Sequence, residues 1–104
     1  MSSSNQTLNP PITLTGQNYH IWSVKMQSFL EVYELWDIVT QDIPIPPLRE
    51  NPTLAQIKSY NEEKAKRSKV KSLIQNSVAD SVFYRIMACS TAKESWDRLS
   101  LKLN

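Results

Sequence analysis

Histidine and cysteine, the side chains best suited to act as a base or a nucleophile near neutral pH, each occur once, as His20 and Cys89. A cysteine-histidine pair can support nucleophilic catalysis, but only an accident of folding would bring these two positions together. We interpret His20 as a surface or partly packed residue of a helix, and Cys89 as a small filler near a helix end. The sequence also contains no zinc-ligand set, no phosphate-binding glycine loop and no nucleophile elbow. It therefore predicts a non-enzymatic protein with no cofactor, metal or small-molecule substrate.

A group of basic side chains is the best candidate for contact with the phosphates of a nucleic acid: Lys64, Lys66, Arg67, Lys69 and Lys71. On a helix, Lys66 and Lys69 point away from the side that the other three share, so the group forms a basic collar and not one stripe. Glu62 and Glu63 precede Lys66 and Arg67 by one helical turn and can pair with them, and no aromatic residue stands among the cations to stack on bases. We favour a solvated helix surface and keep weak RNA binding as the alternative.

The composition indicates one intracellular, helical domain. A chain of 104 residues supports a single core, and a hydrophobic share of 40% with 3 tryptophans is enough to fill it. The single glycine argues against hairpins and phosphate-cradling loops, and helices need glycine least, so we expect an all-α fold. The net charge of +2 is too small to predict nucleic-acid binding by itself. The lone cysteine, with no secretory signal and no membrane-spanning segment, indicates a cytoplasmic protein.

The positions that carry chemistry or packing must be held by helices, and the first is expected just after a polar N-terminus. Residues 1–13 are rich in Ser, Asn, Thr and Pro and predict a disordered tail, so order should begin at Leu14. Asn18 is a plausible N-cap of a helix that begins at Tyr19. Apolar residues then recur at helical spacing: Tyr19, Trp22, Met26, Phe29, Leu30 and Tyr33. Residues 35–39 add a continuation after a bend, or one further turn.

A connector and a long polar helix should follow. Four prolines lie within residues 40–52, at positions 44, 46, 47 and 52, where they remove amide donors and disfavour helix in the residues before them. Asn51 as N-cap and Pro52 as the first helical residue predict a helix over residues 52–75. Tyr60, Val70 and Ile74 share one side of this helix. Glu63 and Arg67 interrupt that side, so the pattern does not determine which face of the helix is buried.

Two further helices complete a bundle of about five. Residues 77–80, with Ser first and Asp fourth, resemble a capping box, and an apolar stripe follows it: Val78, Val82, Phe83, Ile86 and Met87. Thr91 and Glu94 form a full capping box ahead of an apolar series: Ala92, Trp96, Leu99 and Leu103. Because the chain stops inside this amphipathic helix, we expect residues 14–104 to be a domain truncated at its C-terminus.

Two blocks of the sequence resemble a known family. The first contains Gly-x-Asn-Tyr-x-x-Trp at residues 16–22, and its specific elements are Leu14, Gly16, Asn18, Tyr19, Trp22, Met26, Leu30, Leu35 and Trp36. In this order and at about this spacing they resemble the N-terminal Gag region of copia-type LTR retrotransposons. The second contains Thr-Ala-x-Glu-x-Trp-x-x-Leu at residues 91–99 and is similar to the following Gag segment through Thr91, Glu94, Trp96 and Leu99. The resemblance covers residues 12–103.

The resemblance implies a helical, capsid-like domain whose copies associate into a particle around element RNA. It implies no membrane partner. Within this framework Gly16 should meet a positive φ or a close backbone approach just before the first helix. We further expect Trp22 to pack against Trp96 and so join the two blocks. The leading expectation is a structural self-association module, with RNA binding through residues 64–71, or docking of a host partner by a retained relic, as the alternatives.

Overall fold

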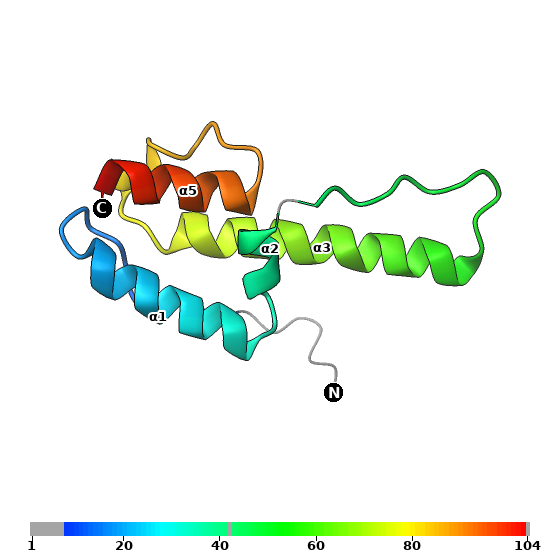
Figure 1. Ribbon diagram of the computed structural model, residues 1–104, viewed down its shortest axis with the longest axis horizontal. Helices are drawn as coiled ribbons and strands as arrows, with labels where there is room; N and C mark the ends of the chain where they lie inside the picture. Colours follow the sequence, from blue (N-terminus) through cyan, green and yellow to red (C-terminus); the bar gives the residue numbers. More distant parts are fainter. Residues whose placement is uncertain (1–7, 42, 104) are drawn as a thin grey trace.

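The regular structure of the chain is entirely helical where it is described. The computed structural model describes residues 8–41 and 43–103. Within these ranges the helices are α1 (Tyr19–Val32), α2 (Trp36–Thr40), α3 (Leu54–Asn76), α4 (Asp80–Phe83) and α5 (Ala92–Leu103) (Figure 1). An isolated bridge between Leu14 and Val78 is the only β-type pairing of the described residues. The prediction of an all-α fold with about five helices is confirmed, and no helix of the described part is long and apolar enough to cross a membrane.

Helix α1 buries most of the stripe that its spacing predicts, although Tyr33, expected as its last member, lies just after the helix and is 43% exposed. Trp22, Met26 and Leu30 are fully buried, and they follow one another at intervals of about one turn. The helix ends at Val32, and Glu34 adopts a left-handed conformation with φ of 59°. This break turns the chain into α2, whose Val39 is buried. The sequence therefore predicted both the first helix and the further turn after a bend.

The start of α3 lies two residues later than predicted. Thr53 is the N-cap: its Oγ1 accepts from the Gln56 amide at 3.0 Å, and Gln56 Oε1 accepts from the Thr53 amide at 2.9 Å. Asn51 instead adopts φ of 55°, so its assignment as N-cap was wrong. These two reciprocal hydrogen bonds satisfy the amides of Thr53 and Gln56, which a helix capped by Asn51 would leave without these partners. The helix therefore begins at Leu54.

Helix α3 has two environments along its length. Its C-terminal half enters the core through Val70, Leu73 and Ile74. Its N-terminal half projects from the core: the proline-containing segment 43–52 runs outward alongside it and α3 returns, which produces the long dimension of a molecule of 50 × 32 × 20 Å (Figure 1). The predicted stripe is interrupted at Glu63 and Arg67 because this part of the helix faces the proline segment and not the core.

The fourth helix is much shorter than predicted. Helix α4 spans only Asp80–Phe83, and its N-cap is Ala79 without a side-chain cap. The expected capping box of residues 77–80 was therefore wrong, because Ser77 is buried and serves as the C-cap of α3. Tight turns follow, in which Arg85, Ile86 and Cys89 each donate to the carbonyl three residues earlier at 2.9 Å. Val82, Ile86 and Cys89 still reach the core, but Met87 is exposed.

Helix α5 begins at the capping box that the sequence predicts. Thr91 Oγ1 accepts from the Glu94 amide at 3.0 Å, and Glu94 Oε1 accepts from the Ser90 amide at 2.9 Å. Ala92 and Leu99 are buried, and the helix packs against α2 and α3. The side chain of Leu103 lies outside the described part.

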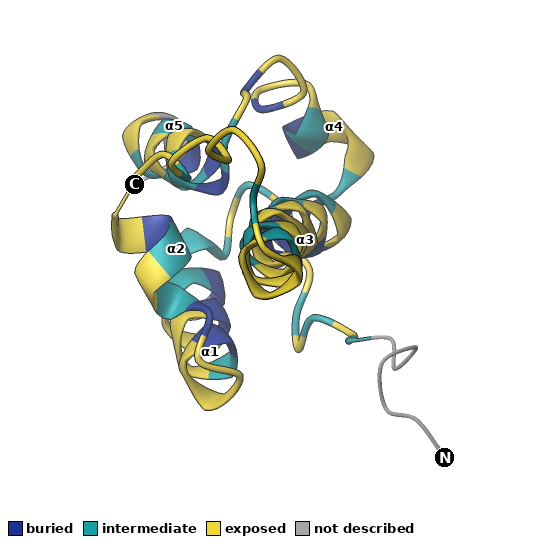
Figure 2. Cartoon of the chain, turned by 90° about the vertical axis from the view of Figure 1, so that its right-hand side faces the viewer, coloured by how far each residue is buried: buried dark blue, intermediate teal, exposed yellow. Residues whose placement is uncertain are grey.

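The core lies where the inner faces of α1, α2, α3 and α5 meet, as the dark residues of Figure 2 show. Leu8 and Ile12 also pack against it, so packed structure begins before the predicted boundary at Leu14. The apolar side chains of these two residues explain the difference, because both reach the core from a mostly polar segment. Residues 1–7 of the predicted tail lie outside the described residues.

Candidate functional site

The tryptophans of both sequence blocks meet at one place. The rings of Trp22 and Trp96 stack with centroids 4.8 Å apart and an interplanar angle of 27°. Trp36 meets Trp96 edge to face, with ring centroids 5.1 Å apart and an interplanar angle of 79°. Stacked and edge-to-face pairs of this kind contribute about 0.5–1.5 kcal/mol beyond their buried area. The predicted contact between Trp22 and Trp96 is confirmed, and it joins α1 to α5.

The buried indole nitrogen of Trp22 has a specific partner. Its Nε1 donates to Ser77 Oγ at 3.3 Å, and the Ser77 hydroxyl donates to the Ile74 carbonyl at 2.8 Å. Trp22 and Ser77 are both fully buried, so each polar group needs such a partner to offset its loss of water. The sequence analysis did not predict this role of Ser77. The available signal was Trp22 itself, because a tryptophan expected in the core needs a hydrogen-bond acceptor for its indole N–H.

The segment before α1 is held by a short backbone pairing. The Leu14 amide donates to the Ser77 carbonyl at 2.7 Å, and the Ala79 amide donates to the Leu14 carbonyl at 2.9 Å. The Leu14 side chain is fully buried. Two backbone hydrogen bonds therefore hold Leu14, the first residue of the first sequence block, against the junction between α3 and α4.

Gly16 and Asn18 shape the turn that leads into α1. Gly16 has φ of 101°, which confirms the predicted positive φ, while a Cβ there would meet Val82 at an ordinary 3.8 Å. The Asn18 Oδ1 atom accepts from the Thr15 amide at 2.9 Å, and its Nδ2 donates to the Thr13 carbonyl at 3.0 Å. Asn18 is the N-cap residue of α1, as predicted, and its carbonyl accepts from the Trp22 amide at 2.9 Å. Its side chain closes the preceding turn instead and makes no cap bond, so the predicted side-chain cap was wrong.

The candidate chemical residues occupy ordinary structural positions. His20 is exposed on α1, and its carbonyl accepts from the Ser23 hydroxyl at 2.9 Å. Cys89 is buried in the core. Within residues 8–41 and 43–103, no three histidine, cysteine or acidic side chains gather in a way that could hold a metal ion. The arrangement at the motif residues therefore organises packing and backbone turns.

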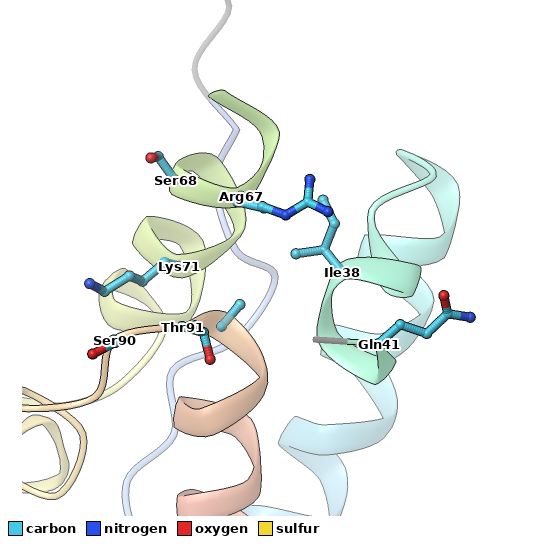
Figure 3. Close-up of a pocket in the computed structure, with 8 residues that line it drawn as sticks. Ile38, Gln41, Arg67, Ser68, Lys71, Ser90 and Thr91 are labelled. Atoms are coloured by element: carbon cyan, nitrogen blue, oxygen red, sulfur yellow. The ribbon is translucent and has the colours of Figure 1, made fainter. Parts of the chain in front are cut away.

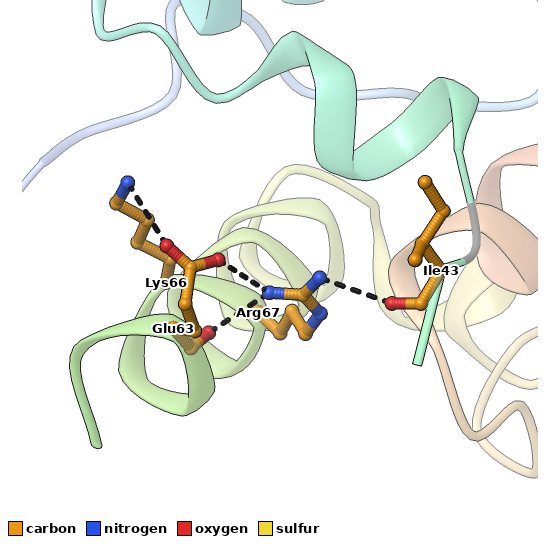
Figure 4. Close-up of polar contacts among 4 residues, drawn as sticks. All are labelled: Ile43, Glu63, Lys66 and Arg67. Atoms are coloured by element: carbon orange, nitrogen blue, oxygen red, sulfur yellow. Dashed lines mark hydrogen bonds and ion pairs between the residues drawn. The ribbon is translucent and has the colours of Figure 1, made fainter. Parts of the chain in front are cut away.

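The basic collar is partly neutralised by one carboxylate. Arg67 Nη1 lies 2.9 Å from Glu63 Oε1, and Lys66 Nζ lies 3.6 Å from Glu63 Oε2 (Figure 4). Of the two predicted pairs, the one between Glu63 and Arg67 is confirmed, and Lys66 pairs with Glu63 and not with Glu62. Arg67 Nη2 also donates to the Ile43 carbonyl at 3.0 Å, which ties α3 to the proline segment.

Two other lysines of the collar are exposed, and one is half-buried. Lys64 and Lys69 are exposed on α3, and Lys64 Nζ lies 5.5 Å from the centre of the Tyr60 ring. Lys71 is half-buried beside the start of α5. The cations therefore surround the helix, as their spacing predicts.

A pocket of 260 Å³ lies where α2, α3 and the start of α5 meet. It is lined by Ile38, Gln41, Arg67, Ser68, Lys71, Ser90, Thr91 and Ala92. Figure 3 shows that Lys71 and Arg67 extend in different directions, and Arg67 already donates hydrogen bonds to the Glu63 carboxylate and the Ile43 carbonyl. Because its two cations do not converge, we assign no ligand to this pocket.

The ion pairs of Glu63 predict a small dependence of stability on pH. The hydrogen bond from Arg67, and then the charge of Lys66, hold the pKa of Glu63 below its ordinary value. A lowered pKa means that the pairs stabilise the fold above the unfolded-state pKa and that this contribution is lost as the pH falls through the folded-state pKa. The pair is partly exposed, so we expect Glu63→Gln to lower the free energy of unfolding by less than about 1 kcal/mol at neutral pH.

Urea unfolding between pH 7 and pH 3, about the range over which a carboxyl group titrates, measures this difference. The gap between wild type and Glu63→Gln should shrink in acid. Glu62→Gln, a change at the neighbouring exposed carboxylate, is the matched control. A gap that stays constant across the range would contradict the assignment.

One family model matches the chain, the Domain of unknown function (DUF4219), over residues 14–40. This range begins at Leu14 and runs through α1 to the end of α2, so it contains the Gly16 turn, Trp22 and Trp36. No curated protein and no solved structure matches the chain.

Proposed function

We propose that this chain is a structural, non-enzymatic self-association module of a copia-type retrotransposon Gag, acting in the cytoplasm. The observation that carries the proposal is the contact between the two Gag-like blocks. Trp22 of the first block stacks on Trp96 of the second across 4.8 Å, although more than 70 residues separate them. Residues that a capsid-like domain would use to build one core are thus in mutual contact, and the DUF4219 match falls on the first block.

The distribution of polar and apolar side chains supports contact as the activity. The motif residues Leu14, Trp22 and Leu99 are all fully buried, so they build the scaffold and are not available to a partner. Several large apolar side chains remain exposed on the described surface, among them Ile21, Val24, Val32, Tyr84 and Leu101. Exposed apolar groups that form one patch are typical of interaction surfaces, and Ile21, Val24 and Val32 all lie on α1.

Sedimentation equilibrium over a rising protein concentration tests the proposal. We expect the apparent mass to increase above the monomer value of 12.0 kDa as concentration rises, because copies associate reversibly. A mass that stays at 12.0 kDa up to millimolar concentration, where even contacts of about 4 kcal/mol are populated, would contradict self-association.

RNA binding through residues 64–71 is the competing function, and it has less support. Glu63 pairs with both Lys66 and Arg67, so part of the positive charge is already compensated. A mobility-shift assay with single-stranded RNA at low and high salt measures how strongly the remaining positive charge binds RNA. Binding that is strong at low salt, falls steeply with salt and is lost in Lys64→Glu with Lys69→Glu would favour the RNA function.

A further inference from the structure

An apolar stripe runs along the side of α1 that faces away from the core. Its members follow helical spacing and are apolar except for the small Ser28: Ile21, Val24, Ser28 and Val32. Ile21 is 54% exposed, Val24 53% and Val32 76%, so more than half of each side chain meets solvent. The outer side of α1 is correspondingly exposed in Figure 2. We call these four residues the α1 stripe.

The α1 stripe borders a shallow hollow that could receive a side chain. The hollow measures 320 Å³ and is lined by Pro11, Val24, Lys25, Ser28, Phe29 and Val32. Ser28, the smallest of the helical members, lies at its centre along the helix, so another helix can approach closely there. The stripe is therefore a continuous surface with a depression and not a set of scattered apolar residues.

The charges beside the stripe are arranged about Ser28. Lys25 precedes Ser28 by three residues and Glu31 follows it by three, and helical geometry puts them on opposite edges of the stripe. Val24 and Val32 lie four residues before and after the same serine. The two valines and the two charges are thus symmetric about Ser28, while Ile21 lies outside this symmetry.

This arrangement complements itself under two-fold symmetry. Consider a two-fold axis that lies in the plane of contact beside Ser28 and runs perpendicular to the line joining Lys25 to Glu31. Rotation about this axis places Lys25 of each copy opposite Glu31 of the other copy. The two α1 helices then cross steeply, and the valines face each other between two ion pairs. Gln27 Nε2 donates to Glu31 at 3.2 Å and steadies that carboxylate, which can accept further bonds.

We propose that the α1 stripe is the surface through which a second copy of this chain binds, in a symmetric pair centred on Ser28. The inference rests on the proposed self-association and names its surface. A stable interface usually has about 20–30 residues a side. The α1 stripe and its flanking charges occupy one face of a 14-residue helix, so the pair is weak and depends on concentration. Opposite charges on the two edges of the stripe make a second copy a better fit than an anionic or cationic surface.

Charge reversal tests the geometry directly. Lys25→Glu and Glu31→Lys each place like charges together twice in the pair, so each variant alone should associate about tenfold more weakly than wild type by sedimentation. Mixed together, the two variants form a pair with both ion pairs restored, one as in wild type and one with its charges exchanged, and association should return to near the wild-type level. The double variant with both changes should recover in the same way.

Cysteine cross-linking tests the position of the axis. Ser28→Cys places two thiols next to the axis, and mild oxidation should link most chains into disulfide dimers at concentrations where wild type associates. Ser59→Cys, at an exposed position on α3, is the matched control and should link far less. Cys89 is buried in both variants.

The outcomes separate this inference from the proposed function. If wild type associates but the charge reversals change nothing and Ser28→Cys links no better than Ser59→Cys, the α1 surface is wrong while self-association stands. If the single variants weaken association and the mixture does not recover it, the stripe serves another arrangement and the two-fold pair is overturned. If wild type does not associate at all, both proposals fail.

Discussion

Replacing Trp22 by alanine is expected to lower the free energy of unfolding by about 3–5 kcal/mol, the usual cost of deleting a large buried aromatic side chain. Trp22 is fully buried, stacks on Trp96 and donates to Ser77. The change removes all three interactions and leaves the buried Ser77 hydroxyl without its donor. For a domain of this size, each kcal/mol corresponds to about 4–8 °C in the thermal midpoint, so the midpoint should fall by more than about 12 °C.

Chemical and thermal unfolding followed by circular dichroism measures this effect. Tyr84→Ala removes an aromatic ring that is 73% exposed, and it should change stability by less than about 0.5 kcal/mol. If Trp22→Ala does not fold, Trp22→Phe keeps an apolar ring without the indole donor and should show a smaller but clear loss. A Trp22→Ala protein with an unchanged midpoint would refute the role of the tryptophan contact.

Leu14→Ala is expected to cost about 2–5 kcal/mol, although Leu14 lies outside every helix. Its side chain is fully buried, and its backbone pairs with Ser77 and Ala79. Truncation leaves a cavity beside the junction of α3 and α4 while the backbone bonds can remain. The loss should therefore be one of packing, and helical content should change little below the unfolding transition.

A leucine on the surface provides the control for this change. Leu54→Ala truncates a side chain that is 85% exposed, and its effect should be within about 0.5 kcal/mol. Equal effects of Leu14→Ala and Leu54→Ala in urea unfolding would show that the segment before α1 does not contribute to the core.

Helical spacing predicted the elements that bury one continuous face. The stripe through Trp22, Met26 and Leu30 predicted α1, and the capping box at Thr91 predicted the start of α5. Spacing alone could not supply the partner of Trp22, and its contact with Trp96 was a separate hypothesis that the structure bears out. A periodic pattern identifies a buried side of a helix but not the helix that covers it.

Helix caps were harder to predict because polar side chains have several partners within reach. Asn18 bonds backward to Thr15 and Thr13, and Ser77 bonds inward to Trp22 and Ile74. Both residue types are common N-caps, yet each satisfies a competing group that only the tertiary structure brings close. Thr53, by contrast, was overlooked next to the Asn51-Pro52 pair, although its Gln56 partner stands at the right spacing in the sequence.

The interrupted face of α3 shows a different limit. Glu63 and Arg67 interrupt the apolar stripe of α3 because their turn of the helix faces the segment 43–52, where Arg67 donates to the Ile43 carbonyl. The pair of Glu63 and Arg67 suits this position because Arg67 bonds to a backbone carbonyl while both side chains stay partly exposed to solvent. No pattern within α3 could predict this contact, since the partner lies 24 residues away in the sequence.

A dilution series of two-dimensional amide NMR spectra tests most directly whether this helical scaffold works by binding copies of itself. Signals from exposed residues of α1, such as Val24 and Val32, should shift as the concentration rises, while the indole signal of Trp22 inside the core should stay in place. Spectra that are identical from the lowest to the highest concentration would contradict the account.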